Sequence, residues 1–174
     1  MENRNDKRMV TGMFRDRESA ERAYDALEEK GYSKDEINVM MSDDTRKKYF
    51  SEDDDSELGS KALEGAGTGS AIGGTVGAIA GIIAAIGTNL VIPGLGLVIA
   101  GPIAAGLAGA GAGGITGGLI GALIGSGIPE EHAVEYEKGI KDGHIVMGVK
   151  PRTEEEAEHI SNDWRNNRGE NIYR

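Results

Sequence analysis

The sequence predicts an α+β fold in which a ferredoxin-like domain is split by a long glycine-zipper helical hairpin. Three observations predict it. A strand-helix-strand pattern occurs near each end of the chain, residues 65–129 contain no Asp, Glu, Lys or Arg, and glycine twice recurs at every fourth residue within that stretch. The chain then divides into the first half of the α+β domain (1–42), an acidic linker (43–62), the hairpin (63–128), and a helix plus the second half of the domain (129–174).

The N-terminal pattern begins with a short strand at residues 9–14. Asp16 is placed to cap a helix that starts at Arg17, and Gly31 is placed to end it. Apolar residues then alternate along positions 37–41, which predicts a second strand with one buried face.

The C-terminal pattern repeats this order. Residues 144–150 form the expected strand, Thr153 and Glu156 have the spacing of a capping box, and Gly169 is placed to stop the following helix before a last strand at 171–173. The halves also match in sequence, since Val10-Thr-Gly12-Met parallels Val146-Met-Gly148-Val. The first helix matches the last one residue further on, with Glu18, Ala20 and Glu21 equivalent to Glu155, Ala157 and Glu158.

Two such units predict four antiparallel strands with two helices on one face. Neither half can bury its apolar face alone, so the halves are expected to meet, which makes the central run an insertion. The linker before it carries seven acidic residues between positions 43 and 60. A further helix is expected over 129–142, with Pro129 as its first residue and Gly143 after its end.

The central run contains 21 glycines in 65 residues. Residues 68–87 and 102–127 are each long enough for a helix that spans roughly 30 Å, and Pro93 and Gly94 between them predict a turn. Glycines without side chains allow close helix packing. The expected helix-packing residues are Gly65, Gly69, Gly73, Gly77 and Gly81 on the first helix, and Gly109, Gly113, Gly117, Gly121 and Gly125 on the second.

Four residues advance about 400° around a helix, so each ladder drifts by about 40° per glycine. One partner helix therefore meets only part of a ladder, which predicts further neighbours and a homo-oligomer. The tip of the hairpin, residues 90–99, is too apolar for a loop in water and is expected to be buried in lipid or inside an assembly. The alternative interpretation of the run is a flexible low-complexity segment.

Composition argues against several function classes. A net charge of −10 without a basic stripe argues against nucleic acid as a partner. The absence of cysteine excludes thiolate chemistry and disulfides. The first ten residues have no apolar stretch that could serve as a signal peptide, which favours a cytoplasmic location.

No motif predicts catalysis. The GxGxxG spacing at residues 109–114 follows no strand and lies inside the zipper, so dinucleotide binding is not expected. His132, His144 and His159 lack the spacing of metal ligands. We therefore expect no enzyme activity, no cofactor, no metal site and no small-molecule substrate.

Several segments together resemble a bacterial family of general stress and low-temperature-induced proteins with a central glycine zipper. The resemblance lies in Gly31-Tyr32-Ser33 leading to Ile37-Asn-Val39, in Ile92-Pro-Gly-Leu-Gly96 with Ala100-Gly-Pro102, and in Gly127-Ile-Pro-Glu-Glu131. The opening strand and helix (10–14 and 18–27), the helix around Tyr136 and the strand at 145–149 extend it. It implies a stress-induced bacterial protein associated with membrane, with no catalytic residues to carry over.

The expected function is that of a non-enzymatic, stress-associated protein that packs its glycine-zipper hairpin in the membrane and keeps an acidic α+β domain in the cytoplasm. Membrane lipid and other copies of the chain are then its partners. The alternative is a soluble homo-oligomer or filament whose core is made of hairpins. A small-ligand sensor is a third hypothesis, and no motif supports it.

Overall fold

An antiparallel sheet of six strands forms the centre of the protein. The computed structural model describes residues 9–50, 79, 90–92, 96–109 and 118–174, and within them the strand order is β3-β4-β2-β5-β1-β6. The α+β class with an antiparallel sheet and several helices is thus confirmed. The strands are β1 (Val10–Phe14), β2 (Ile37–Ser42), β3 (Leu90–Ile92), β4 (Leu97–Ala100), β5 (Ile145–Val149) and β6 (Glu170–Tyr173).

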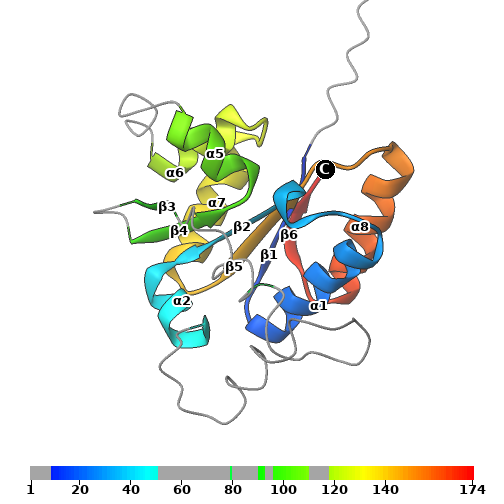
Figure 1. Cartoon of the computed structure of the whole chain (residues 1–174), viewed down its shortest axis with the longest axis horizontal. Coiled ribbons are helices and arrows are strands. Elements are labelled where there is room, and N and C mark those ends of the chain that lie inside the picture. The colour runs from blue at the N-terminus through cyan, green and yellow to red at the C-terminus, as the bar shows by residue number, and fades with distance from the viewer. Residues whose placement is uncertain (1–8, 51–78, 80–89, 93–95, 110–117) are drawn as a thin grey trace, which may run out of the picture.

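Helices cover both faces of this sheet (Figure 1). The helices of the first face are α1 (Arg17–Glu29) and α8 (Glu154–Asn166). The helices of the second face are α5 (Pro102–Gly109), α6 (Gly118–Gly125) and α7 (Glu130–Lys141). A short 3-10 helix (Lys34–Glu36) precedes β2, and α2 (Asp43–Phe50) follows it.

Large aromatic and aliphatic side chains fill the core on the first face. Phe14 and Trp164 meet edge to face with ring centroids 5.7 Å apart, and both side chains are fully buried. Gly12 lies directly beneath Trp164, where a β-carbon would contact the indole ring. Leu27 and Val39 complete the junction of α1 with the sheet.

The second face is as thoroughly buried as the first, which corrects the expectation of helices on one face only. All five residues of β1 and all five of β5 are buried. In β2, Met40 belongs to the second core, while its neighbours Val39 and Met41 belong to the first. The expectation that β2 has one buried and one exposed face is therefore wrong, because helices cover both of its faces.

Helix ends follow the sequence signals closely. The Asp16 carboxylate accepts the backbone N–H of Ser19 at 2.8 Å, and Gly31 ends α1 with a φ of 81°. The Thr153 hydroxyl oxygen accepts the N–H of Glu156 at 3.1 Å. In a capping box the Glu156 carboxylate would accept the backbone N–H of Thr153. The structure shows it accepting the N–H of the preceding residue, Arg152, at 2.9 Å. Pro129 is the cap of α7 rather than its first residue.

The first part of the expected acidic linker is helical. Asp43–Phe50 forms α2, and the Phe50 ring packs against the first core under the Arg17 guanidinium, 4.9 Å from the ring centroid. Arg17 also donates to the Tyr49 carbonyl at 2.7 Å. This segment is therefore docked on the domain, both through the aromatic residues at its end and through the Asp43 N–H at its start, which donates to the Gly96 carbonyl at 2.7 Å. Residues 51–62 lie outside the described residues.

The sequence match between the two halves places equivalent residues on the same face of the sheet for the helices, but not for the strands. Gly12 faces α8, but Gly148 faces the other side of the sheet, where a β-carbon would contact Met9 and Thr11. A shift of one residue reverses every side chain of a strand, so the strand match pairs residues on opposite faces. The helix match instead pairs Ala20 with Ala157, and both are buried in the first core.

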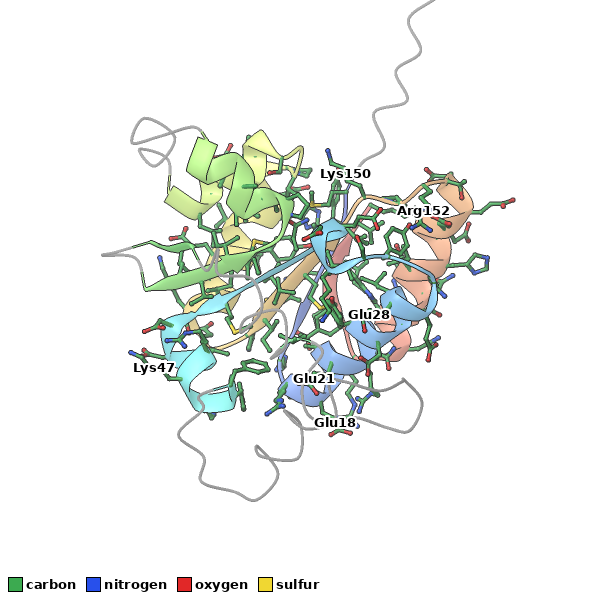
Figure 2. The ribbon with its side chains drawn as sticks, viewed as in Figure 1. Glu18, Glu21, Glu28, Lys47, Lys150 and Arg152 are labelled. Carbon is green, nitrogen blue, oxygen red and sulfur yellow. The ribbon has the colours of Figure 1, made fainter. Side chains whose placement is uncertain are left out.

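The two sequence halves are joined by strand pairing and by several polar contacts, of which the cluster around Tyr32 is one. β1 pairs with β5 from Val10↔Val149 to Phe14↔Ile145. At the top of this interface the Arg152 guanidinium lies 4.4 Å from the centroid of the Tyr32 ring and donates to the Gly31 carbonyl at 2.7 Å (Figure 2). The Tyr32 hydroxyl donates to Glu156 at 2.6 Å.

Tyr136 predicts a loss of stability at alkaline pH. Burial raises its pKa to about 12, and its hydroxyl bonds Thr11 at 2.8 Å and donates to the Asn171 carbonyl. An unfolded tyrosine ionises near pH 10, so this contribution is complete below pH 10 and is lost as pH rises toward 12. We expect the unfolding free energy to fall over this range by on the order of 2 kcal/mol from Tyr136.

The measurement is urea unfolding between pH 8 and 12 for wild type and Tyr136→Phe. The variant should be less stable at pH 8 and decline less steeply above pH 10. Part of the decline should remain, because burial and the bond to Glu156 also raise the pKa of Tyr32 to about 12. Equal slopes for the two proteins would contradict the role of Tyr136.

Candidate self-association surface

The apolar tip of the central run forms part of the sheet. β4 pairs antiparallel with β2 from Val39↔Ala100 to Ser42↔Leu97, and β3 pairs with β4 on its outer side. All four residues of β4 are buried. The expectation that this tip lies in lipid or in an assembly is therefore wrong for residues 97–99, because the domain's own sheet buries them. Pro93 and Gly94 lie between β3 and β4, outside the described residues.

A buried amide in β2 fixes the start of the first helix after the tip. The Asn38 side-chain oxygen accepts the backbone N–H of Ile103 at 2.8 Å, and its amide nitrogen donates to the Gly148 carbonyl at 3.1 Å. Asn38 is 1% exposed. It therefore satisfies an otherwise orphaned donor at the N-terminus of α5 and a carbonyl of β5 at once.

Gly101 permits the close approach that this arrangement requires. Its φ is 98°, a left-handed backbone that side chains disfavour, and a β-carbon there would collide with the Ile37 carbonyl oxygen. Pro102 follows as the first residue of α5, as the sequence predicts. The turn from β4 into α5 thus depends on the absence of a side chain at one position.

The expected second helix of the hairpin, residues 102–127, is not continuous. α5 ends at Gly109 and α6 begins at Gly118, whose φ of 59° is incompatible with a right-handed helix running through it. The two short helices contact each other, and α6 also packs on α7. Leu119 and Leu123 of α6 are buried in the second core.

The ladder glycines fall into three groups. Gly121 and Gly125 lie on the exposed side of α6, where a β-carbon would meet no atom within 4 Å. Gly109 is the last residue of α5. The remaining ladder positions lie outside the described residues: Gly65, Gly69, Gly73, Gly77, Gly81, Gly113 and Gly117.

The first half of the run contributes one described residue, Ile79. Its side chain is fully buried in the first core, among residues of the sheet and α1. Each half of the run therefore supplies at least one side chain to a core of the domain.

Gly121, Ile124 and Gly125 form an uncharged surface that we name the α6 face. These residues are three and four positions apart and so share one side of the helix. Ile124 is 43% exposed, and Val134 on the neighbouring α7 is 46% exposed. They are the two exposed large hydrophobic residues of the described chain. No residue of α6 carries a charge.

The described residues contain no cluster of three or more acidic, histidine or cysteine side chains placed to hold a metal. The histidines lie apart. His132 stacks near Tyr173 with ring centroids 4.8 Å apart, the His144 Nδ1 lies 3.4 Å from the Met13 sulfur, and His159 is exposed on α8. None of the helices in the described part of the chain has the length and apolarity that a membrane crossing needs.

Sequence reasoning missed Asn38 and Gly101. A signal for each was present, since asparagine is uncommon between two β-branched strand residues and Gly-Pro marks a turn. Neither signal identifies its partner, because Asn38 and Ile103 are brought together only by the pairing of β2 with β4.

Comparison of the chain with protein-family models, with curated proteins and with solved structures gives no match.

Two glycine substitutions test the close contact at the start of α5. Gly101→Ala should lower the unfolding free energy by roughly 2 kcal/mol more than Gly96→Ala. Both glycines have a positive φ, at 98° and 59°, but only the alanine at 101 would collide with a backbone atom, since nothing lies within 4 Å of a β-carbon at 96. Urea unfolding followed by circular dichroism gives both values. Equal losses would show that β4 and α5 do not approach β2 as described.

Proposed function

We propose that this protein is a non-enzymatic, self-associating protein in which copies meet through the α6 face. One observation carries the proposal: the second half of the glycine-rich run packs on its own domain and still leaves Gly121, Ile124 and Gly125 uncovered. Monomeric proteins do expose single apolar residues. An uncharged helix face beside a second exposed apolar residue, Val134, is more typical of an interface.

Charge favours this surface over the others. The chain has a net charge of −10, so two copies repel each other over most of their surfaces. Gly118–Gly125 carries no acidic or basic residue, whereas exposed acidic residues occur along α1 and α8. A contact centred on α6 therefore brings two copies together on a helix that carries no like charges.

The spacing of the glycines suits contact between two copies of one helix. Gly121 and Gly125 are four residues apart, which lets two helix backbones cross closely, and Ile124 between them can pack against the partner helix. Identical surfaces related by a two-fold axis form a closed dimer.

The same proposal includes a ferredoxin-like unit split by the central run. Its support is the order β2-β5-β1-β6, with α1 linking β1 to β2 and α8 linking β5 to β6. The chain leaves this unit after β2 and returns at β5, and β3, β4, α5, α6 and α7 lie in between. The run is then an insertion whose two ends lie on neighbouring strands, since β2 pairs with β5.

Membrane association is the second candidate. The observation that favours it is the length of residues 68–87, an uncharged segment of about 20 residues that matches the hydrocarbon thickness as a helix. The burial of Ile79, within this segment, in the first core argues against it. In this version the acidic domain stays in the cytoplasm. A role in bacterial stress rests, for both candidates, on the resemblance of the quoted segments to the stress-induced family.

The proposal is tested by the molar mass of the full-length protein without detergent, measured by light scattering during gel filtration. Wild type should elute as a discrete oligomer. Gly121→Glu combined with Ile124→Glu should shift it toward the monomer mass, because each copy then places two charges in the contact. Asn162→Glu on the exposed side of α8, at the first face of the sheet, is the matched control and should leave the mass unchanged.

A wild-type monomer in solution would overturn the self-association proposal. A protein that is recovered only with detergent or membranes, and whose mass is insensitive to the α6 substitutions, would instead support the membrane candidate. Circular dichroism of the variants must show the wild-type fold for the comparison to hold.

A further inference from the structure

A polar cavity of about 540 Å³ opens at the end of the sheet where β1 and β2 finish and β4 and β5 begin. Three basic side chains line it, Arg15 after β1, Lys48 on α2 and Lys141 at the end of α7. Two carboxylates, Asp44 and Asp142, line it as well. The antiparallel sheet brings these residues together from three separate parts of the chain.

The basic groups are available to a ligand. Lys48 contacts the Tyr49 ring, 4.9 Å from its centroid, and has no carboxylate partner among the described residues. Arg15 pairs with Glu170 at 2.8 Å and is 67% exposed. Lys141 pairs with Glu137 at 2.6 Å and is 68% exposed. Exposed ion pairs of this kind contribute little to stability, so an anion can replace the carboxylates at little cost.

Hydroxyl and backbone groups line the remaining wall. The Thr45 and Ser42 hydroxyl oxygens lie 2.8 Å apart, and the Thr45 side chain is almost fully buried. Gly143 ends α7 with a φ of 93°, and a β-carbon there would lie 3.7 Å from the Thr45 oxygen. His144 follows at the start of β5 and also lines the cavity. These groups supply donors and acceptors beside the charged ones.

The balance of charge in the cavity differs from that of the chain. The chain has 29 acidic and 19 basic residues, but the cavity has three basic residues to two acidic ones. Its volume is within the range of small-molecule sites. Basic groups bind a phosphate, whereas carboxylates accept hydrogen bonds from hydroxyl groups. A ligand that carries both kinds of group uses the whole lining.

The geometry points to a binding site for a small phosphate ester that carries free hydroxyl groups, such as a sugar phosphate. The phosphate lies between Arg15, Lys48 and Lys141, and the hydroxyl groups donate to Asp44 and Asp142. This site shares no residue with the α6 face, so the binding proposal does not depend on self-association.

The test is a titration of the full-length protein with glucose 6-phosphate, inorganic phosphate and glucose, followed by two-dimensional amide NMR. Glucose 6-phosphate should shift the amide signals of Thr45, Gly96 and Gly143 in a saturable way. Inorganic phosphate should shift the same signals more weakly, and glucose should shift them least, since it lacks the charged group.

Charge variants locate the site. Lys48→Gln should weaken glucose 6-phosphate binding roughly tenfold, the loss of one charge-assisted contact. Lys47→Gln is the matched control, because Lys47 is on the same helix, pairs with Asp43 at 2.7 Å and lies on the side of α2 away from the sheet (Figure 2). It should bind as wild type does. No saturable shift, equal binding of inorganic phosphate, or equal weakening by both substitutions would overturn the proposal.

Discussion

The structure depends on one constraint: its central strands are apolar on both sides, so the sheet must be covered by helices on both faces. β1 and β5 are buried along their whole length, and β2 is buried except at its last residue. α1 and α8 cover one face. The other face is covered by α7 and by two helices from the glycine-rich run, α5 and α6. That run is therefore a structural part of the domain it interrupts.

This requirement explains how short, glycine-rich helices persist. α5 and α6 have eight residues each, below the length at which an isolated helix is stable in water. Burial of Ile103, Leu119 and Leu123 against the sheet offsets that weakness, and the bond from Ile103 to Asn38 fixes where α5 begins. Leu119 and Leu123 on one side of α6 are buried, whereas Gly121, Ile124 and Gly125 on the other side are exposed. A helix used in this way can serve the fold and a partner together.

Signals that act within a few residues predicted most helices and strands of the two sequence halves, residues 1–42 and 129–174. The caps at Asp16 and Thr153, the stop at Gly31 and the last strand are correct because each depends on local hydrogen bonds or backbone angles. The second core was not predicted, because alternation in β2 was interpreted as a strand with one buried face. Met40, between Val39 and Met41, was the signal that both faces are apolar.

In residues 96–109 and 118–125 of the central run, glycine periodicity alone does not predict the structure. Glycine at every fourth residue is compatible with a long packed helix, but glycine also permits a positive φ. The positive φ of Gly101 separates β4 from α5, and the positive φ of Gly118 marks the start of α6. Pairing of residues 97–100 with β2 then follows from apolar burial, which the periodicity of glycine does not encode. The polar cavity was beyond sequence reasoning as well, since its basic residues come from segments far apart in the chain.

Amide hydrogen exchange of the full-length protein in detergent-free solution tests most directly whether the run is part of the domain. The account predicts that amides of β4 and of the start of α5, such as Ile99 and Ile103, are protected to a similar degree as those of β5. Rapid exchange at these positions while β1 and β5 stay protected, with protection appearing only when lipid vesicles are added, would contradict it.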